Sequence, residues 1–132
     1  MPKIKVSEAS GVVLNWLVAT YEHTTKHHKY GTPCINPKTK RVYETEGLRQ
    51  IGVNFAPTTD WAQGGPIIER GEIGLKRNAP CSEGRQWEAS PSITAKGAGG
   101  RWGYGPTPLI AAMRCYVASK LGDEVEVPEE LL

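Results

Sequence analysis

The sequence predicts a small α+β domain in which two main helices pack on a small antiparallel sheet. Three observations predict it: an apolar helical repeat near the start of the chain, a sharply delimited helical segment near its end, and short strand-like runs between them. Elements in that order favour a sheet covered by helices. At 132 residues the chain has the usual size of one domain, so we expect residues 1–132 to fold as a single domain.

The first predicted helix covers residues 8–21. Ser7 is suited to cap its N-terminus, and apolar residues recur at the i, i+3, i+4 and i+7 positions of one face, namely Leu14, Leu17, Val18 and Tyr21. Gly11 would lie inside this helix, where glycine costs about 1 kcal/mol relative to alanine.

The next segment, residues 23–46, is predicted to be a long basic loop excursion with one short strand at residues 41–43. Residues 23–41 contain five Lys or Arg residues and no acid, whereas residues 123–132 contain five acids and no base. We interpret both charge runs as solvated, the second as an acidic tail; the alternative for the first is a basic rim that attracts an anion.

Two short strands are predicted at residues 73–76 and 86–89, separated by a turn. The second main helix follows at residues 108–121. Thr107 is its N-cap, Pro108 occupies the first helical position and Gly122 stops it. Its predicted core stripe consists of Ile110, Met113, Val117 and Leu121.

Composition excludes several classes of protein. No run approaches the roughly 18 to 20 apolar residues of a membrane span, and residues 1–6 lack the apolar core of a signal peptide, so we expect a cytoplasmic protein with no membrane partner. The three cysteines, Cys34, Cys81 and Cys115, form no CxxC pair and are expected to be free thiols. A net charge of +2 does not favour a nucleic-acid partner.

Two segments carry a family resemblance. Residues 54–69 contain Pro-Thr-Thr-Asp-Trp-Ala-Gln-Gly-Gly-Pro-Ile-Ile-Glu, and residues 103–114 contain Gly-Pro-Thr-Pro-Leu-Ile-Ala-Ala-Met-Arg. Both resemble the Nin region X family of lambdoid bacteriophages, as do residues 5–16. The resemblance implies a phage protein in the cytoplasm of an infected bacterium, but the family name states no activity. The chain departs from the family at residues 23–41 and in the loops around Cys81 and Gly97, so no ligand contact is carried over there.

Glycines between Gly97 and Gly105 lead into the N-terminus of the second helix, where backbone N–H groups and the helix dipole can hold a phosphate. The spacing matches no named nucleotide motif, and a flexible turn is the alternative. Arg101 offers a charge in the same loop, and Trp102 and Tyr104 offer flat faces for a base. Thr107 and Arg114 complete this half of the candidate site, with Arg114 on the same helical face as Thr107.

The other half of the candidate site comes from residues 54–65. Thr58 or Thr59 can cap a short helical turn, Asp60 can accept from ribose hydroxyls and Gln63 can read a base edge. Gly64 and Gly65 allow close backbone approach. The candidate ligand residues in this segment are Asn54, Thr59, Asp60, Trp61, Gln63, Gly64 and Gly65. The alternative is that Thr59 and Asp60 are caps and Trp61 belongs to the core.

No catalytic residue, metal or cofactor is expected. The histidines at 23, 27 and 28 with Cys34 lack zinc-site spacing, and no nucleophile elbow is present. Pairs such as Asp60 with Glu69, or Glu69 with Glu72, have the chemistry of acid–base catalysis but are surface carboxylates by default.

The inventory of anion cradle, arginine and aromatic faces suits a nucleotide-like small molecule. By analogy with small phage proteins that counteract host defence, we predict sequestration of a signalling nucleotide of the cyclic ADP-ribose type. Hydrolysis of a phosphodiester or pyrophosphate in such a nucleotide is one alternative, and binding to recombination or transcription proteins is another. Homo-oligomerisation is left open.

Overall fold

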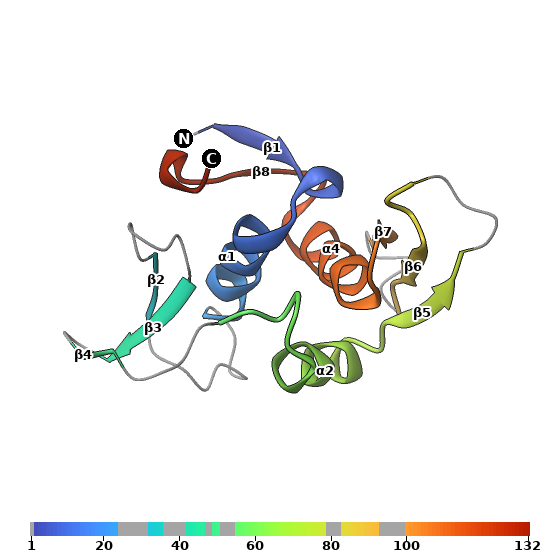
Figure 1. Cartoon of the computed structure of the whole chain (residues 1–132), viewed down its shortest axis with the longest axis horizontal. Coiled ribbons are helices and arrows are strands. Elements are labelled where there is room, and N and C mark those ends of the chain that lie inside the picture. Colours follow the sequence, from blue (N-terminus) through green and yellow to red (C-terminus); the bar gives the residue numbers. More distant parts are fainter. Residues whose placement is uncertain are drawn as a thin grey trace.

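The computed structural model describes residues 2–23, 32–35, 42–46, 49–50, 55–78, 83–92 and 100–132. Within them the predicted α+β class is confirmed. Helix α4 (Pro108–Leu121) lies at the centre, with α1 (Gly11–Glu22) beside it and a small antiparallel sheet on its other side (Figure 1). Helix α2 (Trp61–Arg70) lies near the N-terminal end of α4. None of the helices in this described part has both the length and the apolar character needed to cross a membrane.

Helix α4 has the predicted bounds. The Thr107 hydroxyl accepts from the backbone N–H of Ile110 at 3.2 Å, and Gly122 ends the helix with φ 96°. Of the predicted stripe, Met113 and Val117 are buried, Ile110 is half-buried and Leu121 is 41% exposed, so Leu121 is not a core residue. The stripe was also too narrow, since the buried residues of α4 are Leu109, Ala111, Ala112, Met113, Cys115, Tyr116, Val117 and Ala118. Helix α4 therefore packs against its neighbours on more than one face.

Helix α1 begins later than predicted. Ser7 lies in a separate 3₁₀ turn, η1 (Val6–Glu8), so it is not the cap; Ser10 precedes the helix instead. Gly11 is the first helical residue and has φ 55°, a conformation that glycine adopts without strain. The cost expected for an interior glycine therefore does not apply. The buried face includes the predicted Leu14, Leu17 and Val18.

The sheet beside α4 has the order β5–β6–β7 and is antiparallel throughout. Strands β5 (Gly74–Arg77) and β6 (Trp87–Ser90) lie one residue later than predicted. The third strand, β7 (Gly103–Gly105), falls in the glycine segment and was not predicted. A Cβ on Gly103 would lie 2.3 Å from the Ala111 carbonyl oxygen, so the strand can rest on α4 only because it lacks side chains there.

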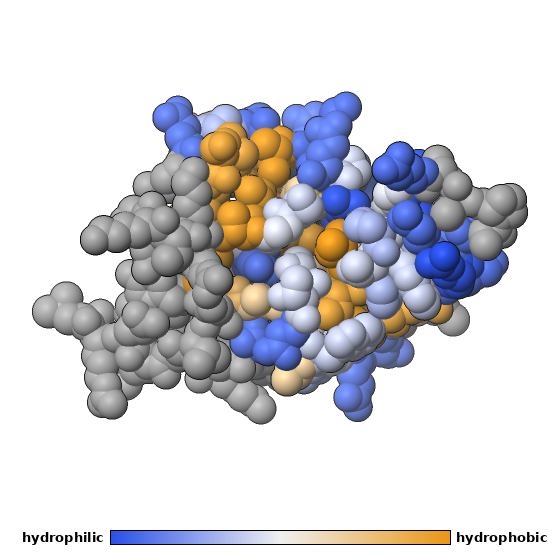
Figure 2. All heavy atoms as spheres, in the orientation of Figure 1, coloured by the Kyte–Doolittle hydropathy of each residue, from blue (hydrophilic) through white to orange (hydrophobic). Residues whose placement is uncertain are grey.

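Strands β1 (Lys3–Lys5) and β8 (Glu124–Glu126) join the two ends of the chain. Lysines face glutamates across the pair, and Ile4 lies opposite Val125. The expected acidic tail at residues 123–132 is therefore not a solvated tail: β8 is followed by a 3₁₀ turn, η2 (Glu129–Leu131), and Val125, Val127 and Leu131 are buried. Figure 2 shows apolar side chains gathered between this strand pair and α1.

The expected basic excursion contains more structure than the single strand predicted at residues 41–43. Strands β2 (Thr32–Ile35), β3 (Val42–Glu46) and β4 (Arg49–Gln50) form an antiparallel sheet. The buried Val42 accepts a hydrogen bond from the backbone N–H of Phe55. The other residues of the excursion, from 24 onward, lie outside the described part of the chain.

Helix α2 corrects the prediction of a short turn capped by Thr58 or Thr59. Asp60 is the cap, its carboxylate accepting from the Ala62 N–H at 2.9 Å, and the Gln63 side chain accepts from the Ala56 N–H at 2.6 Å. The helix then runs for ten residues through two glycines and Pro66.

Candidate functional site

A pocket of about 330 Å³ lies between α4, β7 and the strand pair that joins the chain ends. It brings together three residues that the sequence analysis predicted as ligand contacts: Trp102, Tyr104 and Arg114. Its volume is at the lower end of the usual range for small-molecule sites, roughly 300 to 1,000 Å³. The pocket therefore suits a small ligand.

Arg114 stands in the middle of α4 and is half-buried. Its Nε donates to the Ala9 carbonyl at 2.8 Å and its Nη1 to the Tyr104 carbonyl at 2.7 Å. Burial lowers the pKa of this guanidinium, but arginine stays protonated in proteins. Among the described residues no carboxylate pairs with it. A desolvated positive charge with only neutral partners attracts an anion more strongly than an exposed one does.

Two acids also line the pocket, and each has a cation near it. Glu124 lies directly opposite Lys5 in the β1–β8 register, and Asp123 lies 3.4 Å from the Nε atom of Arg101. Arg85, like Arg114, has no acid partner within the described ranges. The positive charge left without an acidic neighbour therefore lies on the Arg85 and Arg114 side of the pocket.

The two aromatic rings of the pocket differ in what they offer. The guanidinium carbon of Arg85 lies 4.1 Å from the centroid of the Tyr104 ring, so one face of that ring is already covered by a cation. Trp102 is 49% exposed at the pocket. Trp102 therefore presents about half of its surface to solvent at the pocket.

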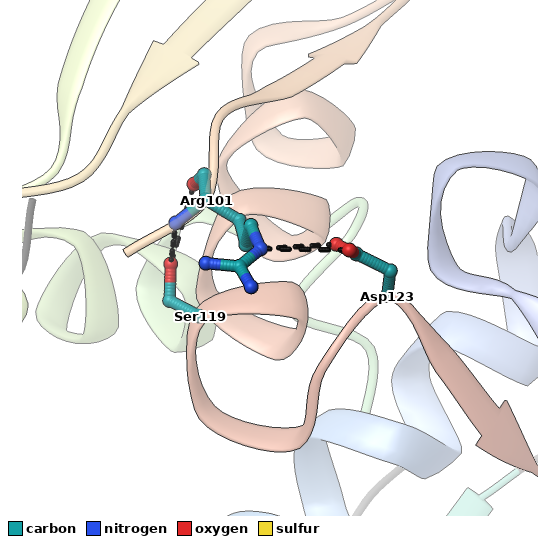
Figure 3. A network of polar contacts seen from close by, with 3 residues as sticks. All are labelled: Arg101, Ser119 and Asp123. Atoms are coloured by element: carbon teal, nitrogen blue, oxygen red, sulfur yellow. Dashed lines mark hydrogen bonds and ion pairs between the residues drawn. The ribbon is translucent and has the colours of Figure 1, made fainter. Parts of the chain in front are cut away.

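Arg101 and Thr107, the other candidate residues in this half of the site, do not line the pocket. Arg101 holds Asp123 with its side chain and Ser119 with its backbone (Figure 3). Thr107 is exposed and caps α4. Gly105, like Gly103, is packed against that helix, since a Cβ there would lie 2.9 Å from the Ala111 nitrogen. Close strand–helix packing, not an open anion cradle, accounts for these two glycines.

The first segment does not join this site. None of its described candidate residues lines the pocket, and Asn54 lies outside the described part of the chain. Asp60 and Gln63 hold the N-terminus of α2, and Gly64 is buried against the Pro57 carbonyl. The remaining candidates are Thr59 and Trp61, both exposed, and the half-buried Gly65. Trp61 is not a core residue, since 54% of it is exposed.

The sequence analysis missed two cations of the pocket, Arg85 and Lys5. Arg85 follows Gly84, which has φ 81° in the turn between β5 and β6, and nothing in the local sequence separates it from an ordinary surface arginine. The alternative that Asp60 is a cap is correct, and it had a further signal, since an Asp three residues before a Gln is the spacing of a capping box.

A second pocket, of about 380 Å³, lies beside the other face of α4 and is lined in part by Cys115, Tyr116 and Lys120. Burial raises the pKa of the Cys115 thiol to about 11. Because the thiolate is the reactive form, Cys115 is a poor nucleophile near neutral pH.

A family model described as Bacteriophage P22, NinX matches residues 5–120. No curated protein matches the chain significantly. The matched range includes both predicted segments and most of the pocket lining, but ends before Asp123 and β8.

Proposed function

The chain belongs to the family described as Bacteriophage P22, NinX, and we propose that it is a phage accessory protein that binds and sequesters a nucleotide-like anion. The ligand occupies the 330 Å³ pocket, with its phosphate beside Arg85 and Arg114 and its planar ring against Trp102. The binding takes place in the cytoplasm of the infected bacterium.

The observation that carries this proposal is the half-buried guanidinium of Arg114, which lines the pocket and has backbone carbonyls as its described partners. Burying a charge is costly unless it is compensated. A phosphate oxygen accepts charge-assisted hydrogen bonds from arginine and supplies that compensation. Arg85, already stacked on Tyr104, adds a second cation at the same wall.

Sequestration of a host signal is the function we favour for such a site, because a phage gains from removing a defence nucleotide whether or not it is destroyed. A nucleotide of the cyclic ADP-ribose type combines the phosphate and planar base that the pocket suits. Hydrolysis of the same ligand is the alternative, and the two differ in whether the nucleotide is recovered intact.

Calorimetric titration with AMP, ADP and ADP-ribose tests the binding. We expect wild-type protein to bind at least one of them, and Arg85→Ala and Trp102→Ala each to weaken that binding at least tenfold, about 1.4 kcal/mol. Both side chains are exposed, so the variants should fold normally. Arg77→Ala is the matched control, because Arg77 stacks on Trp87 of the same sheet and does not line the pocket.

The nucleotide is then released by heat and identified by mass spectrometry. Recovery of the intact nucleotide supports sequestration, whereas a cleaved product supports the hydrolase. The binding proposal is wrong if wild-type protein binds none of the three nucleotides, or if Arg85→Ala and Trp102→Ala bind as tightly as Arg77→Ala.

A further inference from the structure

Ser119, in the last turn of α4, binds both backbone groups of a residue 18 positions earlier. The Arg101 N–H donates to the Ser119 hydroxyl oxygen at 2.8 Å, and the hydroxyl donates to the Arg101 carbonyl at 3.2 Å (Figure 3). A single hydroxyl thus satisfies the donor and the acceptor of Arg101, as a neighbouring strand would in an antiparallel sheet.

A serine inside a helix commonly turns its hydroxyl to the carbonyl four residues earlier or to solvent. Here the hydroxyl bonds across to the segment that leads into β7. The side chain of Arg101 reaches Asp123, just beyond the end of the same helix, at 3.4 Å. Arg101 is therefore held to the C-terminal end of α4 through both its backbone and its side chain.

The residue after Arg101 is Trp102, which lines the pocket, and α4 also carries Arg114, five residues before Ser119. The contact between Ser119 and Arg101 thus connects the segment that bears the aromatic ring to the helix that bears the charge. Ser119 itself lines the second cavity and not the pocket, so its contribution to binding must pass through Arg101.

We propose that Ser119 is a positioning residue for the ligand pocket. By holding the backbone of Arg101 it sets the spacing between the Trp102 ring and the Arg114 guanidinium, and so selects ligands whose ring and anionic group match that spacing. The inference rests on the proposed function for its effect on affinity, but its effect on the backbone is independent of any ligand.

Amide hydrogen exchange of the ligand-free protein tests the backbone effect. We expect Ser119→Ala to speed exchange at the Arg101 amide by about threefold to tenfold, the range for losing one hydrogen bond. Ser119→Thr, which keeps the hydroxyl, should restore slow exchange. Lys120→Ala is the control, because Lys120 is exposed on the same turn and should leave exchange at residue 101 unchanged.

Titration with ADP then tests the consequence for binding. Ser119→Ala should weaken ADP binding about fivefold or more at an unchanged melting temperature, and Ser119→Thr should recover most of it. Unchanged exchange in Ser119→Ala would overturn the positioning role whether or not ADP binds. Faster exchange with wild-type ADP affinity would also overturn it, since the contact would then be structural only. If wild-type protein binds no nucleotide but Ser119→Ala still exchanges faster at residue 101, the backbone contact is supported. Only the proposed function is then contradicted.

Discussion

Glu22 is a buried carboxylate that side chains from two other helices satisfy. The Tyr116 hydroxyl of α4 donates to one of its oxygens at 2.8 Å, and Arg70 of α2 forms an ion pair with the other. Glu22 ends α1, so this one residue links α1 to α2 and α4. Removing either partner would leave part of a buried charge uncompensated, which is costly.

This cluster predicts an alkaline dependence of stability. Burial, and secondarily the hydrogen bond to Glu22, raise the pKa of Tyr116 well above its usual value of about 10. The Tyr116 phenol therefore stays neutral in the folded protein at a pH where it ionises in the unfolded chain. Its contribution to the free energy of unfolding is fully present below about pH 10 and falls as the pH rises further.

We therefore expect Tyr116→Phe to be less stable than wild type by about 1 to 3 kcal/mol at pH 8. Between pH 10 and 11 it should lose less stability than wild type. Urea unfolding at pH 8, 10 and 11 measures both effects, and the contributions of the other titrating groups cancel when the two proteins are compared. Parallel losses in the two proteins would show that Tyr116 does not carry the alkaline dependence.

At the scale of elements, two neighbouring glycines in α2 have different surroundings. Gly64 faces inward, where a Cβ would lie 2.5 Å from the Pro57 carbonyl oxygen and 2.6 Å from the Leu109 side chain. Gly65 faces open space, with nothing within 4 Å of a Cβ. The first glycine is required by packing and the second is not, although they are neighbours in one helix.

The pair gives opposite predictions. Gly64→Ala should destabilise the fold by about 1 to 3 kcal/mol through overpacking, whereas Gly65→Ala should stabilise it by about 0.5 to 1 kcal/mol through helix propensity. Chemical denaturation of the two variants beside wild type is the measurement. A change of the same sign in both would mean that α2 does not pack on Pro57 and Leu109 as described.

At the scale of the whole molecule, the last ten residues close the fold. Strand β8 pairs with β1, and Val125, Val127 and Leu131 are buried, the two valines within the main core cluster. The backbone N–H of Val127 also donates to the Pro2 carbonyl at 3.0 Å. The two ends of the chain are thus held together beside α1, as Figure 1 shows.

Truncation after Gly122 should therefore be severe. Three buried apolar side chains contribute about 1.5 to 3 kcal/mol each, which is comparable with the 5 to 15 kcal/mol that stabilises a typical domain. We expect the cooperative melting transition to be lost or strongly lowered in calorimetry. Deletion of Leu132 alone is the control, since that residue is 62% exposed. A normal transition in the truncated protein would contradict this account of the closing strand.

Features set by neighbouring residues were predictable. The cap, first residue and stop of α4 act within a few positions, so Thr107, Pro108 and Gly122 located that helix to the residue. Helix α2 also had a local signal in Asp60 and Gln63, but the sequence analysis predicted only a short helical turn there. The sequence analysis predicted a tail where β8 lies. The alternating glutamates and valines of that segment acquire a buried face only when β1 lies beside them.

By itself the sequence determined the α+β class, the family resemblance and the second main helix. It also predicted a candidate site, and three of its residues, Trp102, Tyr104 and Arg114, line one pocket. Those inferences rest on local spacing and on runs of consecutive residues. Only the tertiary structure decided that Arg85 and Lys5 join that pocket, that residues 59–65 do not line it, and that Gly103 and Gly105 serve packing. These outcomes depend on which distant segments meet across α4, and local spacing carries no information about such contacts.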